Sequence, residues 1–129
     1  MKPQLPHQPP FLFVGEILES DAQRLQILAD FPAHNPYVGS GSVPRSLLVE
    51  ALAQGMAAHA QVSGKARDER GVLAMVKKVK FFASVMPSER VVVHVAFKRA
   101  FGKLLYYTCA ARTATALLCE GDVVAAIIS

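Results

Sequence analysis

The sequence predicts an α+β fold in which an antiparallel sheet of about six strands wraps around one long central helix. One stretch, residues 43–64, is apolar on nearly every side and rich in good helix formers, which is typical of a buried helix. The segments around it have the β-rich composition and the apolar alternation of strands. A long apolar helix and several antiparallel strands bury one another most economically when the sheet curves around the helix.

The central helix has the sequence VPRSLLVEALAQGMAAHAQVSG over residues 43–64. Ser40 and Ser42 can cap its start, and Pro44 suits a first-turn position, where its missing N–H is not needed. Gly64 can end the helix. About 20 residues at ~1.5 Å each give a rod of roughly 30 Å, the width of a small domain.

Two polar residues, Glu50 and Gln54, interrupt the apolar surface of this helix. They are four positions apart and therefore share a face. A buried carboxylate is unfavourable unless it is paired, protonated or used in chemistry. Two interpretations stay open from the residues alone: a half-exposed glutamate bonded to a neighbour, or a functional acid.

The expected strands alternate or are rich in β-branched and aromatic residues, and they cover residues 14–19, 24–31, 72–85, 91–98 and 104–111. Residues 31–42 are expected to form a loop, because prolines and glycines exclude regular structure there. Residues 112–116 fit either a bulged continuation of a strand or a short loop. Residues 117–128 are expected to form a terminal hairpin that turns at Glu120-Gly121-Asp122.

Length and composition predict one domain over residues 1–129, with 52% hydrophobic and 19% charged residues. No apolar run reaches the length of a membrane span, and the first ten residues do not resemble a secretion signal, so we expect a cytoplasmic protein. Cys109 and Cys119 fit no metal spacing or disulfide framework and are expected to be buried free thiols. The net charge of +4 is too modest for a nucleic-acid binder.

Three stretches resemble the FabA/FabZ-type β-hydroxyacyl-acyl carrier protein dehydratases, which have the hotdog fold. LPHQPPFLFVGEILE at residues 5–19 is similar to the opening of that family. LLVEALAQ at 47–54 is similar to its central helix, in which Gln follows Glu by four positions, and this is the most specific match. VKKVKFFASVMPSERV at 76–91 is similar to a strand and turn of the family. The resemblance implies dehydration of 3-hydroxyacyl-acyl carrier protein thioesters to trans-2-enoyl thioesters, in fatty-acid-like or polyene biosynthesis.

The loop before the helix departs from the family pattern. The family usually has Gly-His-Phe-Pro-Gly-His-Pro there, with the first His catalytic, whereas this chain has AHNPYVGSGSVPR. The usual distance back from Glu50 reaches Pro36, which leaves His34 as the local candidate. The altered loop together with the shared helix resembles a divergent FabA-like subgroup associated with aryl polyene and related pigments.

The resemblance implies a role for each candidate residue. His34 would be the base that takes the proton from C2, since an imidazole suits proton transfer near neutrality. Glu50 would be the acid for the leaving hydroxyl, because apolar surroundings keep a carboxyl group protonated. Gln54 would orient Glu50, and N–H groups at Gly39 or Gly41 could polarise the thioester carbonyl. In the family, the His and Glu of one site come from two subunits, which implies a homodimer or a higher oligomer.

The resemblance also implies an acyl carrier protein as partner, and no cofactor besides the phosphopantetheine that carries the substrate. No metal, nucleic acid or membrane span is expected. The basic residues proposed to receive the acidic carrier are Arg45, Lys77, Lys78 and Lys80, although most such residues are ordinary solvated charges. His59 lies about 180° around the helix from Glu50 and should not share its site.

Two other functions stay open. The altered His motif fits a non-catalytic subunit that binds acyl carriers or pairs with an active dehydratase as a heterodimer. A hotdog thioesterase, in which a helix carboxylate activates water, is the second alternative.

Overall fold

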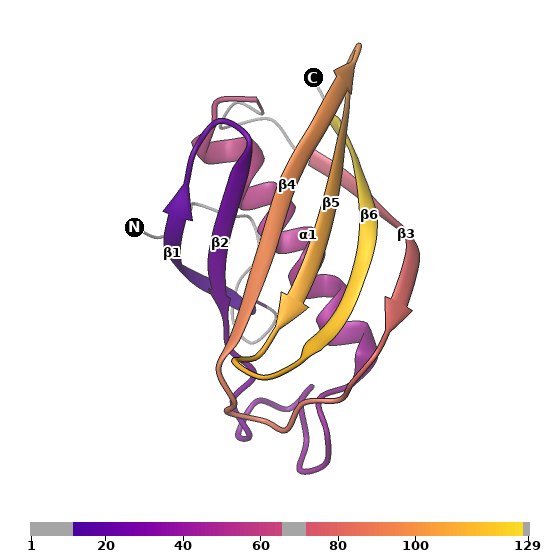
Figure 1. The fold of residues 1–129 in the computed structure, drawn as a ribbon. Helices are drawn as coiled ribbons and strands as arrows, with labels where there is room; N and C mark the ends of the chain where they lie inside the picture. Colours follow the sequence, from indigo (N-terminus) through magenta and orange to yellow (C-terminus); the bar gives the residue numbers. More distant parts are fainter. Residues whose placement is uncertain (1–11, 66–71, 128–129) are drawn as a thin grey trace.

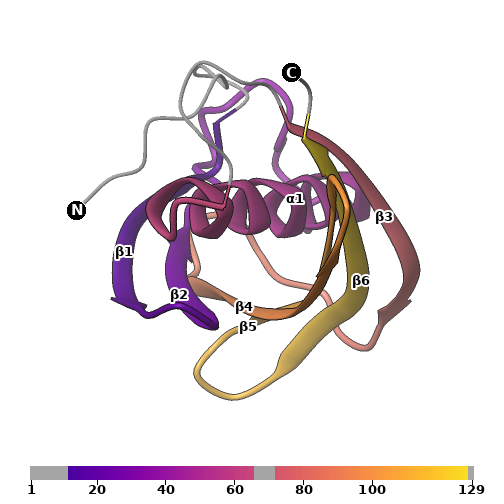
Figure 2. The same ribbon diagram turned by 90° about the horizontal axis from the view of Figure 1, so that it is seen from above.

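A computed structural model describes residues 12–65 and 72–127. Its elements are, in chain order, β1 (Val14–Ser20), β2 (Arg24–Ala29), α1 (Arg45–Val62), β3 (Val72–Phe81), β4 (Val91–Phe101), β5 (Leu104–Arg112) and β6 (Leu117–Ile127). The six strands form one antiparallel sheet in the order β1-β2-β4-β5-β6-β3. This sheet curls around α1 (Figures 1 and 2), which confirms the predicted α+β hotdog fold. Within the described ranges, no helix has the length and apolar character needed to span a bilayer.

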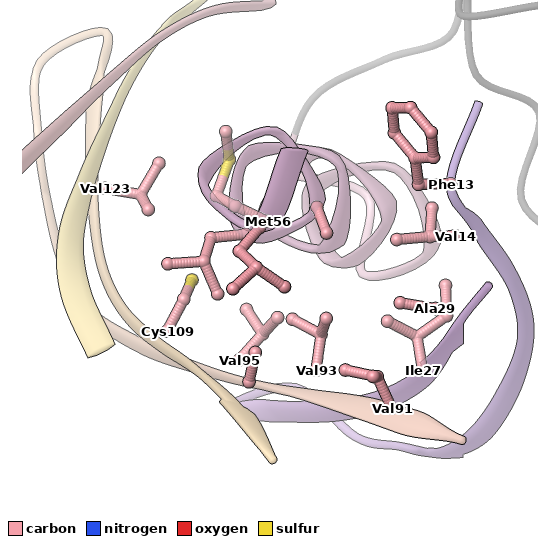
Figure 3. Packing of buried hydrophobic residues seen from close by; sticks show 14 of the residues in the cluster. Phe13, Val14, Ile27, Ala29, Met56, Val91, Val93, Val95, Cys109 and Val123 are labelled. Atoms are coloured by element: carbon pink, nitrogen blue, oxygen red, sulfur yellow. The ribbon is translucent and has the colours of Figure 1, made fainter. Parts of the chain in front are cut away.

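The side chains between the sheet and α1 come from alternate strand positions, and Figure 3 shows how they converge on the helix. Ile27 of β2, Val93 of β4 and Met56 of α1 are each 0% exposed. In β2 and in the first half of β4, every second side chain is buried against the helix, as the alternating pattern expected of strands requires. Gly55 allows α1 to approach β4 closely, because a Cβ atom there would lie 2.8 Å from Val93 Cγ1.

The helix begins later than predicted and without a side-chain cap. Pro44 is its N-cap residue, with φ −56° and ψ 139°, and no side chain bonds to the first turn. The expected caps Ser40 and Ser42 were wrong, as was a first-turn position for Pro44. The cause is tertiary, because the Val43 N–H donates to the carbonyl oxygen of Val85 at 2.8 Å and ties the entering chain to the β3–β4 loop. The predicted end is confirmed, with Gly64 at φ +78° just after the helix.

The predicted terminal hairpin was wrong, because β6 runs without a turn from Leu117 to Ile127. Glu120 pairs with Ala110 and Asp122 pairs with Thr108, so this polar segment is part of the ladder with β5. Gly121 is buried where β3 bulges, and a Cβ atom there would lie 3.0 Å from Val79 Cγ2. The glycine therefore serves a close approach between strands rather than a turn.

Residues 113–116 form a loop, which settles the ambiguity of the sequence. The Thr113 hydroxyl oxygen accepts the Ala116 N–H at 3.1 Å. Cys109 and Cys119 are buried free thiols, as predicted. Burial raises the pKa of Cys119 to about 11 and raises the pKa of Cys109 still further.

His59 is a buried structural residue in the second half of α1. Its Nε2 lies 2.9 Å from the carbonyl oxygen of Asp21, and its Nδ1 lies 2.9 Å from the hydroxyl of Tyr107. A carbonyl oxygen only accepts, so Nε2 carries the proton and Nδ1 accepts from the tyrosine. The ring thus ties the helix to the β1–β2 turn and to β5, and both of its nitrogens are engaged there.

Candidate functional site

The candidate acid is held by a buried amide. Gln54 is 0% exposed, and its Oε1 accepts the N–H of Phe13 at 2.8 Å and that of Val14 at 3.3 Å. These two donors fix the orientation of the amide, because only its oxygen can accept them. Its Nε2 then donates to Glu50 Oε1 at 3.2 Å. Gln54 therefore connects the start of β1 to one oxygen of the Glu50 carboxyl group.

Glu50 lies at the boundary between the core and solvent. It is half-buried, whereas its helix neighbours Leu47 and Ala51 are 5% and 0% exposed. This position combines an apolar surrounding with access from outside. The carboxyl group is therefore neither fully exposed nor sealed in the core.

The candidate base lies in a loop that folds around Asn35. The Asn35 N–H donates to the Pro32 oxygen at 3.0 Å, and its own carbonyl oxygen accepts the Val38 N–H at 3.0 Å. Its side-chain Oδ1 accepts the N–H of Tyr37 at 2.9 Å. Asn35 is only 8% exposed, whereas the neighbouring His34 is exposed. Sequence reasoning missed Asn35, although an Asn-Pro pair in a glycine-containing loop is a known signal for such a turn.

His34 lines a cavity of about 910 Å³ beside this loop. Phe13 and Val14 contribute to its wall, and Glu89 and Arg90 lie on it from the segment before β4. Glu50 is not among the lining residues. A single chain therefore does not bring His34 and Glu50 together in this cavity. Phe13 and Val14 connect the two regions, because they line the cavity and also donate their main-chain N–H groups to Gln54, which bonds to Glu50.

The two candidate glycines differ. Gly39 has φ +75°, a conformation that favours glycine, and its N–H points to the carbonyl oxygen of Asn35 at 3.5 Å. Gly41 is exposed, and a Cβ atom there would meet nothing within 4 Å. The N–H groups of Gly39 and Gly41 both lie before α1, which begins at Arg45, so neither belongs to the first turn of the helix.

The four basic candidates lie apart from one another. Arg45 is exposed at the start of α1, and its guanidinium carbon lies 4.9 Å from the centre of the Phe81 ring. Lys77 and Lys80 of β3 pair across the sheet with acidic residues of β6, and Lys78 between them has φ +54°. Lys77 and Lys80 therefore each lie opposite an acidic residue, Asp122 and Glu120 respectively, on the neighbouring strand β6. No cluster of three or more His, Cys, Asp or Glu side chains that could hold a metal occurs in ranges 12–65 and 72–127.

Comparison with known proteins gives a consistent result. The family described as ApeP-like, ApeP dehydratase, matches residues 1–126. The 3-hydroxyacyl-acyl-carrier-protein dehydratase FabZ of Agrobacterium fabrum is 29% identical over 133 residues, covering 96% of this chain and 84% of that protein. FabZ of Rhizobium etli is 30% identical over 134 residues, with the same coverage.

Solved structures share the fold. The dehydratase heterocomplex ApeI:P from Xenorhabdus doucetiae superposes with a TM-score of 0.77 at 12% identity, over 97% of this chain and 88% of that one. The fluoroacetyl-CoA thioesterase FlK superposes with a TM-score of 0.70 at 16% identity, over 91% and 90% of the two chains. Identities this low establish the common hotdog architecture alone.

Proposed function

This chain belongs to the ApeP-like dehydratase family, and we propose that it removes water from 3-hydroxyacyl thioesters held on an acyl carrier protein, giving trans-2-enoyl thioesters. One observation carries the assignment of the acid. The buried Gln54 amide, fixed by the main-chain N–H groups of Phe13 and Val14 where β1 begins, directs its N–H at Glu50. A carboxyl group held in one orientation at the edge of an apolar core can deliver its proton reproducibly to a leaving hydroxyl.

The reaction needs two proton transfers. His34 takes the proton from C2, and the electron pair of that C–H bond forms the C2–C3 double bond. The C3–O bond breaks, and the leaving hydroxyl takes the proton of Glu50 and departs as water. The imidazolium and the carboxylate that remain return to their starting states when the proton passes back from one to the other, directly or through solvent. With Glu50 Oε1 accepting from Gln54, the transferred proton is the one on Oε2.

We propose that each site is built by two chains. His34 lies on a cavity that Glu50 does not line, so a second chain is needed to bring an imidazole to the acid. The ten-residue strand β3 forms one edge of the sheet, and an edge strand of this length is a template for pairing with another chain. Pairing of β3 with its copy would continue the sheet and close a symmetric dimer.

We further propose that the substrate arrives on the phosphopantetheine arm of a carrier, so that the chain needs no cofactor of its own. Arg45 is the basic candidate best placed for this partner, because it stands exposed at the start of the helix that carries Glu50. The Lys77, Lys78 and Lys80 group would contribute less, since acids of β6 lie opposite two of its members. Two buried free thiols fit the reducing cytoplasm as the compartment.

The assignment is tested by assaying the purified chain with a 3-hydroxyacyl-carrier thioester and following the enoyl product. Glu50→Gln and His34→Ala should each lower kcat by roughly 100-fold or more, the usual contribution of a general acid or base. Glu120→Gln and His94→Ala are matched controls on the outer side of the sheet and should keep wild-type turnover. Release of free carrier thiol without enoyl product would instead identify a thioesterase.

A second candidate function is a subunit that supports an active dehydratase. The altered loop motif around His34 favours it, and the relative from Xenorhabdus doucetiae is described as a dehydratase heterocomplex. This function predicts no turnover by the chain alone and restored or enhanced turnover when a partner dehydratase is added. Under it, Glu50→Gln in this chain would leave the activity of the mixture unchanged.

A further inference from the structure

The outer face of the sheet, which points away from α1, carries exposed apolar side chains at one end. Leu73 of β3 pairs with Ala126 of β6, which pairs with Leu104 of β5, which pairs with Phe101 of β4. Directly paired residues lie on the same face of a sheet, so these four side chains form a row across four strands. Leu105, the neighbour of Leu104, is buried in the core, which places the row on the outer face.

A second row lies next to the first and has the composition of a binding surface. It runs from Met75 through Val124 and Tyr106 to Arg99, whose guanidinium carbon lies 4.7 Å from the centre of the Tyr106 ring. We call the two rows the outer-face patch. Its large apolar members are unusually accessible, with exposed fractions of 76% for Phe101, 66% for Leu73, 58% for Met75 and 36% for Leu104.

The β4–β5 hairpin extends beyond the other strands and carries the most exposed residue of the patch near its tip (Figure 1). Cations surround this tip: Lys98, Arg99 and Lys103 are all exposed. The sequence has no Asp or Glu from position 91 to position 119. The acids of β6 on the outer face, Asp122 and Glu120, lie outside the two rows of the patch, where they pair with Lys77 and Lys80.

We propose that the outer-face patch docks on an anionic lipid surface, with Phe101 entering the headgroup region and the surrounding cations contacting lipid phosphates. Aromatic rings favour the boundary between headgroups and acyl chains, and each Lys or Arg near an anionic surface adds attraction. None of the residues of the patch is a candidate catalytic or carrier-binding residue, although Leu73 and Met75 lie on β3, the strand whose edge is proposed to pair in the dimer. The inference needs only the outer face of that strand, which edge pairing leaves uncovered.

The shape and charge of the patch favour lipid over the other occupants. Its large apolar members are exposed near the tip of the β4–β5 hairpin and at the adjoining end of β3, and none of them lines the cavity beside His34 or a hollow of about 630 Å³ further along the outer face. A convex apolar tip needs a matching concavity on a protein, whereas fluid lipid adapts to it. A second copy of the chain docked through the same patch would place Arg99 and Lys98 close to their own copies, which like-charge repulsion opposes.

The test is co-sedimentation of the full chain with vesicles of phosphatidylcholine alone and of phosphatidylcholine mixed with phosphatidylglycerol. The proposal predicts binding to the anionic vesicles, weak binding to the neutral ones, and release by high salt. Phe101→Ser and Lys98→Glu should each weaken anionic-vesicle binding by roughly tenfold. Phe82→Ser, which changes a 54% exposed phenylalanine at the opposite end of the sheet, and Arg112→Glu, with the same charge change as Lys98→Glu, are the matched controls.

Each other outcome overturns the proposal. Equal binding of the wild type to both kinds of vesicle would show that the cations do not contact anionic lipid. Binding to neither kind would show that the patch is not a lipid-binding surface. Equal losses in Phe101→Ser and Phe82→Ser would show that the patch is not the contact. If the wild type does not bind vesicles but self-associates in sedimentation-velocity experiments, and Phe101→Ser abolishes that association, the patch is a protein interface. Thermal melts of all four variants verify that each is folded.

Discussion

At the scale of single residues, the candidate site depends on the buried amide of Gln54, which lies between the start of β1 and Glu50. The spacing of Glu50 and Gln54 predicts that they share a helix face, and the 3.2 Å hydrogen bond between them agrees. The two main-chain donors from Phe13 and Val14 could not be predicted, because they come from a segment about 40 positions away. Those donors make Gln54 a rigid support for Glu50 rather than a mobile neighbour.

Replacement of Gln54 by Leu should destabilise the protein and disturb Glu50 together. The buried N–H of Phe13 would lose its acceptor, which costs about 1–3 kcal/mol in the free energy of unfolding. Turnover should fall further than stability alone explains, because the carboxyl group loses its fixed donor. Urea unfolding and the enoyl assay measure the two effects. Gln26→Leu on the outer face is the control, and equal stability of the two variants would contradict the role given to Gln54.

A second residue-scale prediction concerns His59. Burial lowers its pKa from the usual 6.5, with a smaller contribution from the Lys65 charge, while the Asp21 carbonyl bond and carboxylate oppose this. Because the unfolded chain binds the proton more readily, stability is complete above about pH 6.5 and decreases as pH falls from there towards the folded-state pKa.

Urea unfolding at a series of pH values measures this effect. His59→Gln, which cannot titrate, should be less stable at neutral pH but should show a smaller loss on acidification. His94 also has a pKa lowered by burial and by Arg112, so His94→Gln serves as the comparison. If His59→Gln loses as much stability on acidification as the wild type, protonation of the buried ring is not the cause.

At the scale of elements, the loop between β2 and α1 holds the candidate base through Asn35. Its side-chain oxygen and main-chain groups bond to Tyr37, Pro32 and Val38, and these bonds define the path on which His34 lies. A loop rich in proline and glycine was predicted here. The hydrogen-bonded turn inside it was not, because residue type alone does not say which of several polar side chains becomes buried.

Asn35→Ala should therefore lower the turnover of the enzyme, while Asn35→Asp, which keeps the acceptor oxygen, should retain more of it. We expect a loss of roughly tenfold for the alanine variant, since misplacing a catalytic group by a small distance has effects of that order or larger. Indistinguishable kcat values for the two variants would mean that the acceptor bond does not position His34.

The misread elements show why local patterns fail. Glu120-Gly121-Asp122 has the composition of a turn, yet it lies inside β6, because Gly121 accommodates the approach of Val79 from β3. Ser42 is a residue type that often caps helices, yet the hydrogen bond from the Val43 N–H to the Val85 carbonyl oxygen fixes the chain there, and the helix begins after Pro44. In both cases a contact between distant segments overrides a correct local preference.

At the scale of the whole molecule, the curved sheet and its helix could be predicted, because both follow from periodicity that lies within each segment. The proposed pairing of His34 with Glu50 could not be predicted, since one folded chain leaves His34 on a cavity without Glu50. If the site is built by two chains, neither the sequence nor a single subunit contains it complete. The edge strand β3 is then as necessary for catalysis as the residues that meet the substrate.

The most direct test of this account mixes two inactive variants. Glu50→Gln and His34→Ala chains are unfolded together, refolded as an equimolar mixture and assayed with a 3-hydroxyacyl-carrier thioester. Half of the dimers should be mixed, and each mixed dimer should have one intact site of two, so the account predicts about a quarter of the wild-type turnover. A mixture as inactive as either variant alone would contradict a site shared between His34 of one chain and Glu50 of its partner.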